Sequence, residues 1–200
     1  MTGPVPRQGL KFEILSEADF TNFVRQHATS PEIGKIGTYL DDKDDAEDHG
    51  EPRLFGLTGC GRICGAASCV IKENVSCEGQ TCKLDAIAID VGLRNRGLAS
   101  AVVAKAFIDL VTEPALRIGR IYSYAVHPAT VRLLSRLSFS DPPPVGAPLS
   151  GVNFDDVPRD SFLDICRTSF QSAVVLLKLQ CAMCLSGDRR ARPWCRPNRS

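Results

Sequence analysis

The sequence predicts an α+β fold around a mixed central sheet, and three observations support this. An apolar run with β-branched residues, Lys83–Ile89, is typical of a buried strand. After a turn rich in arginine and glycine, apolar residues recur at helical spacing over Leu98–Val111, and Arg120–Val126 again resembles a strand. Because a helix joins these two strands, we expect them to pair in parallel. Upstream, Leu54–Thr58 and Ile63–Glu73 flank a short glycine turn, which predicts antiparallel strands leading into the same sheet. Asn74–Gln80 is expected to form the next turn, with Gly79 available for a positive φ.

The N-terminal part predicts one more strand and at least one helix. Leu10–Leu15 alternates apolar and polar residues, as an opening strand does. Ser16 is a candidate N-cap with Asp19 three residues later, so we expect a helix over about Glu17–His27. A second short helix over Pro31–Leu40 is left open.

The C-terminal part predicts two helices and a last strand. A helix is expected after His127-Pro128, with its apolar residues facing inward: Val131, Leu133, Leu134 and Leu137. Four prolines make Asp141–Gly151 a loop that cannot be a helix or a central strand. Asp160–Phe170 slightly favours a short helix, and Ala173–Leu179 has the composition of a final strand.

The turn before the Leu98–Val111 helix has the chemistry of an anion site. The first turn of a helix leaves backbone N–H groups without partners, and the helix dipole adds partial positive charge there. Gly97 removes a side chain from this turn, Ala99 is small, and Arg94 and Arg96 carry charge at its rim. A diphosphate could therefore approach the N–H groups closely. The alternative is an ordinary strand–loop–helix whose arginines are solvated.

The spacing Arg94-x-x-Gly97-x-Ala99 is more specific than a lone glycine in a basic loop. Preceded by a strand and Asp90, it resembles the acetyl-coenzyme-A signature of the GCN5-related N-acetyltransferases (the GNAT family), whose pattern is Gln/Arg-x-x-Gly-x-Gly/Ala. The resemblance covers about residues 10–180 and implies the GNAT fold, a central mixed sheet of about six to seven strands flanked by about four helices. We therefore expect a GNAT domain over residues 1–180 and a flexible tail rich in Cys and Arg over residues 181–200.

The resemblance also implies a coenzyme site, with acetyl-coenzyme A (acetyl-CoA) as co-substrate. Main-chain groups of Ile87 and Ile89 would bond to the pantetheine arm, where the two parallel strands splay apart. The diphosphate would be held by the turn and the start of the helix, which consist of Arg94, Asn95, Arg96, Gly97, Leu98, Ala99 and Ser100.

Acetyl transfer to an amine needs a base for the ammonium proton, and Asp85 is the best candidate. Side chains alternate along the strand, so we expect Asp85 to share a face with Ile87 and Ile89. Some GNAT enzymes carry a catalytic carboxylate at the matching position. The alternative is an aspartate at a strand end on the solvent side. Glu73 is a second and weaker candidate for the base.

The sequence departs from the family at the acid that would protonate the leaving thiolate. Many members carry Asn, Ala and a catalytic Tyr at fixed distances before a Gly-Phe pair. Counting back from Ser138-Phe139 places His127, Thr130 and Leu134 at these positions, so the usual tyrosine is absent. A reaction without a dedicated acid, or a loss of catalysis, is left open. The candidate substitutes near the end of the parallel pair are Tyr124, which we place first, His127 and Tyr122.

Composition is that of a globular protein, with 44% hydrophobic and 24% charged residues. A net charge of +1 provides no general reason to expect nucleic acid or a membrane as a partner. The N-terminus has no apolar export segment and no apolar run is long enough to span a membrane, so we expect a cytoplasmic protein. The nine cysteines are then expected to be reduced thiols.

Two further features have open interpretations. Residues 41–51 carry seven acidic side chains and one lysine, which predicts either a solvated loop or an acidic rim for a cationic acceptor. Cys181-x-x-Cys184 and Cys195 resemble part of a zinc site. Only Cys166 is offered as a fourth ligand, and nothing in the sequence requires it, so we expect no metal.

These observations predict an N-acetyltransferase that moves an acetyl group from acetyl-CoA to a primary amine of a small molecule or a protein. Monomer and homodimer are both left open. The alternative is a catalytically weak GNAT-fold protein that binds coenzyme A as a regulatory or interaction module. The missing tyrosine favours this alternative, whereas the phosphate motif and Asp85 favour the enzyme. No motif identifies the acceptor.

Overall fold

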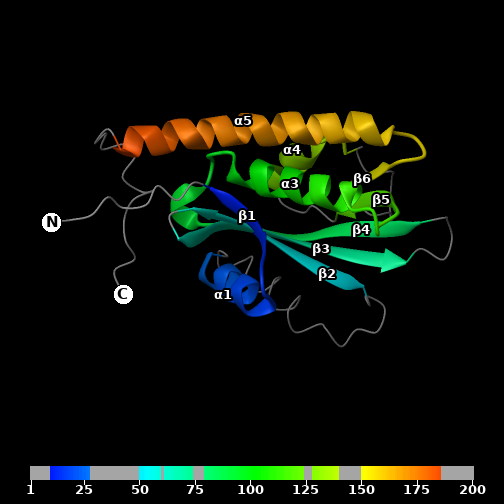
Figure 1. Ribbon diagram of the computed structural model, residues 1–200, viewed down its shortest axis with the longest axis horizontal. Coiled ribbons are helices and arrows are strands. Elements are labelled where there is room, and N and C mark those ends of the chain that lie inside the picture. Colours follow the sequence, from blue (N-terminus) through cyan, green and yellow to red (C-terminus); the bar gives the residue numbers. More distant parts are fainter. Residues whose placement is uncertain are drawn as a thin grey trace.

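In the computed structural model, one mixed sheet of six strands, counted over the described residues, lies between helices (Figure 1). The structure describes residues 10–27, 50–59, 61–73, 79–123, 128–139 and 150–185, with side chains described as far as residue 176. Several sequence-based expectations fall outside these residues. They concern the helix at Pro31–Leu40, nearly all of the acidic segment 41–51, Tyr124, His127 and the tail after residue 185.

The strands follow one another across the sheet in chain order, from β1 to β6. Their bounds are β1 Lys11–Ile14, β2 Glu51–Gly59, β3 Arg62–Glu73, β4 Gln80–Ile89, β5 Ile118–Ser123 and β6 Ser150–Asn153. All neighbouring pairs are antiparallel except β4 and β5, which are parallel. The predicted mixed sheet, with a parallel pair joined through a helix, is confirmed.

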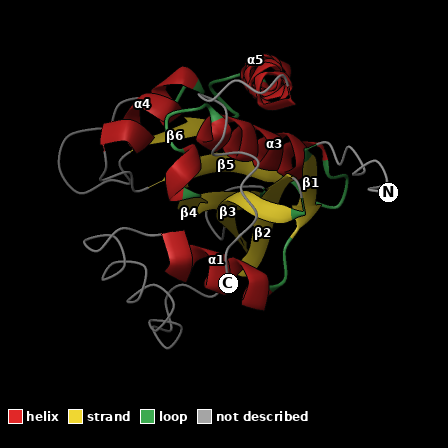
Figure 2. Cartoon of the chain, turned by 90° about the vertical axis from the view of Figure 1, so that its left-hand side faces the viewer, coloured by secondary structure: helices red, strands yellow, loops and turns green. Residues whose placement is uncertain are grey.

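The helices lie in two layers (Figure 2). One face of the sheet is covered by α1 (Glu17–His27), and the other by α3 (Leu98–Thr112), α4 (Pro128–Arg136) and α5 (Arg159–Leu185). A short 3₁₀ turn, η2 (Val91–Leu93), precedes α3. Within the part of the chain that the structure describes, no helix combines the length and apolar character needed to cross a membrane.

The main core lies between the sheet and the layer of α3, α4 and α5. The ring of Phe107 in α3 lies 5.7 Å from the ring of Phe139, which follows α4, and 6.0 Å from the ring of Phe162 in α5. All three side chains are buried, so each helix of this layer is anchored to the same aromatic cluster. The smaller core beneath α1 consists of Phe20, Phe23, Val24, Leu15, Ala66 and Ala88.

Two local signals in the sequence are confirmed in detail. The Ser16 hydroxyl accepts a hydrogen bond from the Asp19 N–H (3.1 Å) and donates to the Asp19 carboxylate (2.6 Å), which caps α1 at its predicted start. Gly79, in the turn before β4, has φ = 127°. A Cβ atom there would lie 2.6 Å from the carbonyl oxygen of Arg117, so the turn requires glycine.

One side chain of α4 does not face the predicted way. Leu133, Leu134 and Leu137 are buried as expected, but Val131 is 42% exposed. Successive helical residues are rotated by about 100°, which places Val131 roughly 110° from the centre of the leucine stripe. Val131 therefore lies beside the buried face rather than on it.

The predicted final strand at Ala173–Leu179 is wrong, because this segment belongs to α5. Phe162, Cys166 and Ala173 are buried at spacings of four and seven residues, along the face of α5 that packs on α3. This helical period continues from the segment expected as a short helix and outweighs the β-branched composition. The predicted domain boundary at residue 180 falls inside α5 and remains a prediction.

A strand that the sequence did not predict, β6, begins at Ser150, inside the expected proline-rich loop. It pairs on one side with β5, where Gly151 lies opposite Tyr122. A four-residue strand at the edge of the described sheet has no repeating pattern of its own. Its position is set by pairing with β5, which short-range periodicity cannot reveal.

Candidate active site

The turn between β4 and α3 is built around the buried carboxylate of Asp90. One oxygen of Asp90 accepts a hydrogen bond from the N–H of Gly92 (2.8 Å), and the other lies 3.6 Å from the guanidinium of Arg62. The N–H of Asp90 donates to the carbonyl oxygen of Cys64 (3.0 Å). Because Arg62 and Cys64 belong to β3, these contacts fix the turn to the sheet.

Gly97 is the N-cap of α3 and has a left-handed backbone, with φ = 80° and ψ = 0°. Its carbonyl oxygen accepts the first helical bond, from the N–H of Ala101 (3.0 Å), and no side chain at this position caps the other N–H groups. A Cβ atom at Gly97 would lie 3.7 Å from the Cβ of Ala173, an ordinary contact, so conformation rather than space requires glycine. Uncapped N–H groups at a helix N-terminus suit a phosphate group.

Arg94 does more than carry charge at the rim of this turn. Its guanidinium donates a 2.7 Å hydrogen bond to the carbonyl oxygen of His27, the last residue of α1. Arg94 and Arg96 are half-buried, whereas Asn95 is exposed and has a left-handed backbone with φ = 62°. The structure therefore brings the predicted residues of the turn together and shows that Arg94 also ties α1 to it.

His27 is a contributor to this turn that sequence reasoning missed. Its Nδ1 atom accepts a 3.4 Å hydrogen bond from the N–H of Val91, and its ring lies 4.6 Å from the ring of Phe23. Burial lowers the pKa of His27, with smaller effects from Asp90, which raises it, and from nearby arginines, which lower it. Since Val91 is 64 residues away in the chain, no local pattern could reveal this contact.

A β-bulge interrupts β4 at Asp85. Cys69 of β3 pairs with Leu84 and Ser68 pairs with Ala86, so Asp85 is the extra residue. The parallel pairing of β4 with β5 is described from Gln80 to Leu84, whereas β4 itself continues to Ile89. The bulge thus lies at the last described pair of the two parallel strands.

The bulge changes which side chains share a face, and the expectation that Asp85 lies with Ile87 and Ile89 is wrong. Ile87 and Ile89 pack against the core beneath α3, as Leu84 does. Asp85 instead pairs with Lys83, which alternates with Leu84 and therefore lies on the α1 face of the sheet. One extra residue in a strand reverses the alternation beyond it.

Asp85 is the most strongly perturbed carboxylate of the site. Its side chain is 5% exposed, and one oxygen lies 3.1 Å from the ammonium of Lys83, which is 15% exposed. Its other oxygen is buried without a hydrogen-bond partner, as is the hydroxyl of Ser68. Burial raises the pKa of Asp85 to about 7. A carboxylate with this pKa suits proton transfer near neutral pH.

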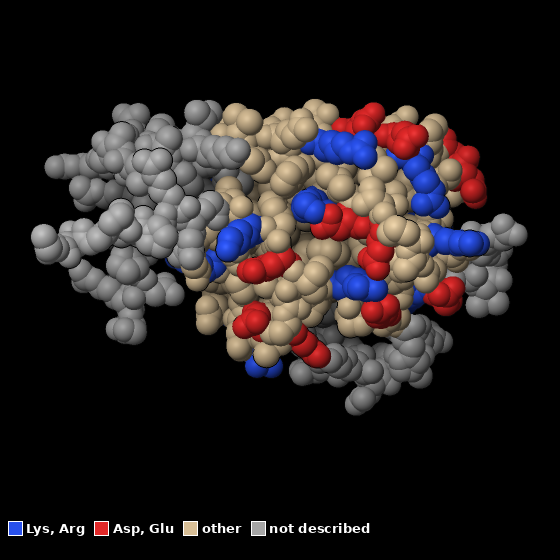
Figure 3. All heavy atoms as spheres, viewed as in Figure 1, with Lys and Arg blue, Asp and Glu red and all other residues tan. Residues whose placement is uncertain are grey.

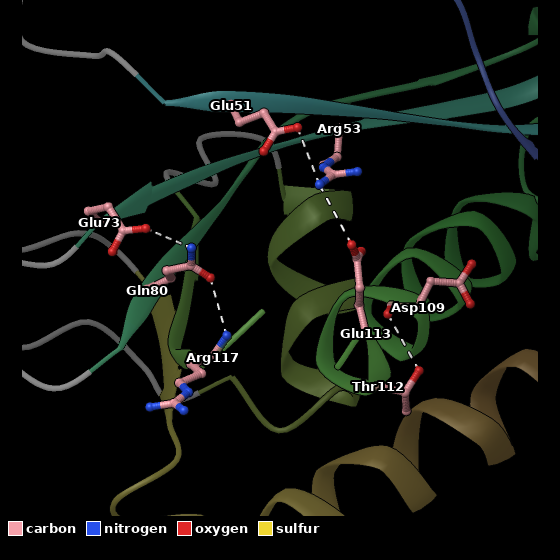
Figure 4. A network of polar contacts seen from close by, with 8 residues as sticks. All are labelled: Glu51, Arg53, Glu73, Gln80, Asp109, Thr112, Glu113 and Arg117. Carbon is pink, nitrogen blue, oxygen red and sulfur yellow. Dashed lines mark hydrogen bonds and ion pairs between the residues drawn. The ribbon is translucent and has the colours of Figure 1, made fainter. Parts of the chain in front are cut away.

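Glu73, the second candidate for the base, is the last residue of β3 and lies beside Gln80 (Figure 4). It is exposed and accepts a 2.8 Å hydrogen bond from the side-chain amide of Gln80. The same amide group of Gln80 accepts a 3.2 Å bond from the N–H of Arg117. Glu73 thus belongs to a polar contact at the start of β4 and does not join Asp85.

Among the candidate acids, the structure describes Tyr122, whereas Tyr124 and His127 lie outside the described residues. Tyr122 is half-buried and pairs with Lys83 across the parallel strands, so both side chains belong to the same face. The guanidinium of Arg120 lies 5.9 Å from the ring centre of Tyr122. Leu134, at the position of the usual tyrosine, is 1% exposed and part of the main core.

The cysteines of the described core are buried and form no disulfide, as expected: Cys64, Cys69, Cys82 and Cys166. Burial raises the pKa of Cys166 to about 12, which keeps it a thiol. Cys166 and Cys181 are also separated by roughly 22 Å along one continuous helix, so Cys166 cannot complete a zinc site with Cys181. No cluster of metal-binding side chains occurs in the portion of the chain with described positions.

No protein-family profile and no curated protein matches this sequence. Solved structures do match. A chain of the KacTA–DNA complex is 17% identical with a TM-score of 0.56, over 78% of this chain and 99% of that one. A mutant of the AtaT toxin, bound to the C-terminus of the antitoxin AtaR and to acetyl-CoA, is 17% identical with a TM-score of 0.53, over 74% and 96% of the two chains.

A candidate GNAT-family acetyltransferase from Desulfovibrio desulfuricans is also similar, at 17% identity and a TM-score of 0.54, over 72% of this chain and 99% of that one. In each case the match spans nearly all of the solved chain. The resemblance seen in the turn before α3 thus agrees with the arrangement of the whole sheet and its helices. The chain has the fold of the GCN5-related N-acetyltransferases.

Proposed function

We propose that this protein is an N-acetyltransferase that transfers the acetyl group of acetyl-CoA to a primary amine of an unidentified acceptor. One observation carries the proposal. A single strand, β4, leads from a buried carboxylate of raised pKa at Asp85 to an uncapped helix N-terminus at Gly97. The first is suited to accept a proton and the second to hold a diphosphate.

The residues proposed to hold the coenzyme are those expected from the sequence. Main-chain groups of Ile87 and Ile89 would bind the pantetheine arm beyond the last described pair with β5. The diphosphate would lie at the turn and the first residues of α3: Arg94, Asn95, Arg96, Gly97, Leu98, Ala99 and Ser100. Solved AtaT structures with acetyl-CoA support this assignment through the shared fold.

Bound acetyl-CoA would supply an acetyl group activated as a thioester. The acceptor amine attacks the carbonyl carbon, so that a C–N bond forms while the C–S bond breaks. Asp85 takes the proton that the amine nitrogen loses, and the thiolate takes a proton from an acid or from water. Tyr122, Tyr124 and His127 remain the candidate acids, with Tyr124 placed first.

The test combines binding and turnover. Calorimetric titration of the full chain with acetyl-CoA should show saturable binding, and release of free thiol should follow on addition of an accepted amine. A full chain that does not bind acetyl-CoA would contradict the whole proposal. Binding without thiol release across the amine panel would favour the alternative, a coenzyme-binding regulatory or interaction module. The burial of Leu134 in place of a catalytic tyrosine is the observation that favours this alternative.

Small-molecule and protein amines are both proposed acceptors. Basic and acidic side chains interleave on the face shown in Figure 3, where the described residues form no patch of a single sign. Solved neighbours include AtaT complexed with acetyl-methionyl-tRNA, so the amine panel should contain an aminoacyl-tRNA. The expectation of a partner other than nucleic acid is therefore part of what the panel tests. A cytoplasmic location and a homodimer also remain proposals.

A further inference from the structure

Lys83 is not among the residues proposed to hold the coenzyme, yet it forms an ion pair with the proposed base, Asp85. We propose that Lys83 is a positioning residue, which fixes Asp85 through one carboxylate oxygen and leaves the other oxygen to take the proton of the acceptor amine. This inference rests on the proposed function and names a residue that the GNAT resemblance does not supply.

At the bulge, Lys83 contacts only one of the two carboxylate oxygens of Asp85. Lys83 and Asp85 lie two residues apart on the same face of β4, and the ammonium lies 3.1 Å from one carboxylate oxygen. The second oxygen is buried and has no hydrogen-bond partner, and across the bulge the hydroxyl of Ser68 on β3 is also buried without one. Buried polar atoms are nearly always paired, so these two oxygens point to a polar group that binds between them.

Among the described charged side chains on this face of the sheet, Lys83 is the one that contacts Asp85. On this face β3 contributes Lys72, two residues beyond Val70, the partner of Lys83, and β5 contributes Tyr122 beside Lys83. The α1 side chains packed on this face are apolar: Phe20, Phe23 and Val24. Among described residues, the ion pairs of Asp85 are therefore made by Lys83.

Lys83 therefore controls the protonation state of Asp85, on which its action as a base depends. Burial favours the neutral carboxyl, whereas a nearby ammonium favours the carboxylate. Burial raises the pKa of Asp85 to about 7, and the ammonium 3.1 Å away stabilises the ionised carboxylate at neutral pH. Without this ammonium, burial acts unopposed and the carboxyl group stays protonated over the range in which it should accept a proton.

The first experiment titrates the side-chain carboxyl carbons of the full chain by NMR, without coenzyme. Lys83→Met should raise the pKa of Asp85 by about one unit or more, and Lys83→Arg should restore it to within about 0.3 units. Lys105→Met is the matched control, since it removes the lysine of another Lys–Asp pair, with Asp109 in α3, and should leave Asp85 unchanged. An unchanged pKa of Asp85 in folded Lys83→Met would overturn the proposal. Lys83→Gln replaces Lys83→Met if the latter does not fold.

The second experiment measures kcat/KM against pH with the best amine of the panel. The acid limb should move to higher pH in Lys83→Met and return in Lys83→Arg, while binding of acetyl-CoA stays constant. An acid limb that does not move would overturn the role of Lys83 in the reaction. A wild-type protein without turnover would contradict the proposed function, whereas the effect of Lys83 on Asp85 would still be decided by the titration.

Discussion

Burial disfavours the charged forms of both Asp85 and His27, so it raises the pKa of the first and lowers that of the second. Both side chains lie where two elements of the fold meet. Asp85 lies at the bulge where β3 and β4 change register, and His27 joins the end of α1 to the turn before α3. Each residue therefore allows a test of one part of the site by a single substitution.

If Asp85 is the base, Asp85→Asn should lower turnover by roughly 10²-fold or more while binding of acetyl-CoA persists. The substitution keeps the shape of the side chain and removes its negative charge and its capacity to take a proton. Thiol release and calorimetry measure the two effects separately. Asp109→Asn, which alters the carboxylate of the Lys105 pair in α3, is the control and should keep wild-type turnover. Unchanged turnover in Asp85→Asn would show that this carboxylate is structural.

His27 should make the turn sensitive to acid. Its pKa is lowered in the folded protein, so between the usual value of 6.5 and the folded value the unfolded chain binds more protons. Stability contributed by His27 is complete above pH 6.5 and declines as the pH falls below it. Protonation also removes the acceptor for the Val91 N–H, so affinity for acetyl-CoA should fall as the pH drops below 6.5.

The variant His27→Asn keeps a hydrogen-bond acceptor and does not titrate, so its affinity should change less over this range. Comparing it with wild type isolates His27, because Asp85, whose pKa is raised, contributes a stability that declines as the pH rises towards 7. Parallel pH profiles of the two proteins in calorimetry would refute the role of His27.

At the scale of elements, α3 connects the site to the core. Its N-terminus forms the proposed diphosphate site, while its buried residues hold the sheet on one side and α5 on the other. Ala173 of α5 lies beside Gly97, so the final helix packs directly against the start of α3. A charge placed at the N-terminus of α3 therefore tests binding, and a truncation in the core beneath α5 tests packing.

Ser100→Asp should weaken binding of acetyl-CoA at least about tenfold without loss of stability. A carboxylate in the first turn of a helix is favourable for the helix dipole but repels a diphosphate at the same N–H groups. Thr112→Asp introduces the same charge in the last turn of α3 and should leave the affinity unchanged. The measurements are calorimetric titration and thermal unfolding. Equal affinities of Ser100→Asp and wild type would show that the diphosphate does not bind at this turn.

Phe162→Ala should lower the free energy of unfolding by about 3–5 kcal/mol. The ring is fully buried in α5 and lies 6.0 Å from that of Phe107 and 5.4 Å from that of Phe154. Val131→Ala is the control: this valine is 42% exposed in α4, and its truncation should change stability by less than about 0.5 kcal/mol. Denaturant unfolding measures both. Similar losses in the two variants would mean that α5 is not packed as described.

At the scale of the whole molecule, features encoded by neighbouring residues could be predicted and features encoded by distant pairing could not. The cap of α1 by Ser16 and the turn at Gly79 depend on a few adjacent residues, and both are confirmed. The bulge at Asp85 depends on the register between β3 and β4, which no single strand specifies. In α5 the local composition favoured a strand, but packing along α3 determined a helix.

The order of the strands has a consequence for how the chain folds as it is synthesised. Since each strand lies beside the one made just before it, from β1 to β6, the sheet can grow by adding one strand at a time. No strand of the described sheet has to wait for a partner from the far end of the chain, which keeps contacts short in sequence and favours rapid folding. The exception is α5, the last described helix, which covers α3 only after the sheet is complete. The proposed diphosphate site at the start of α3 would therefore form before α5 emerges from the ribosome.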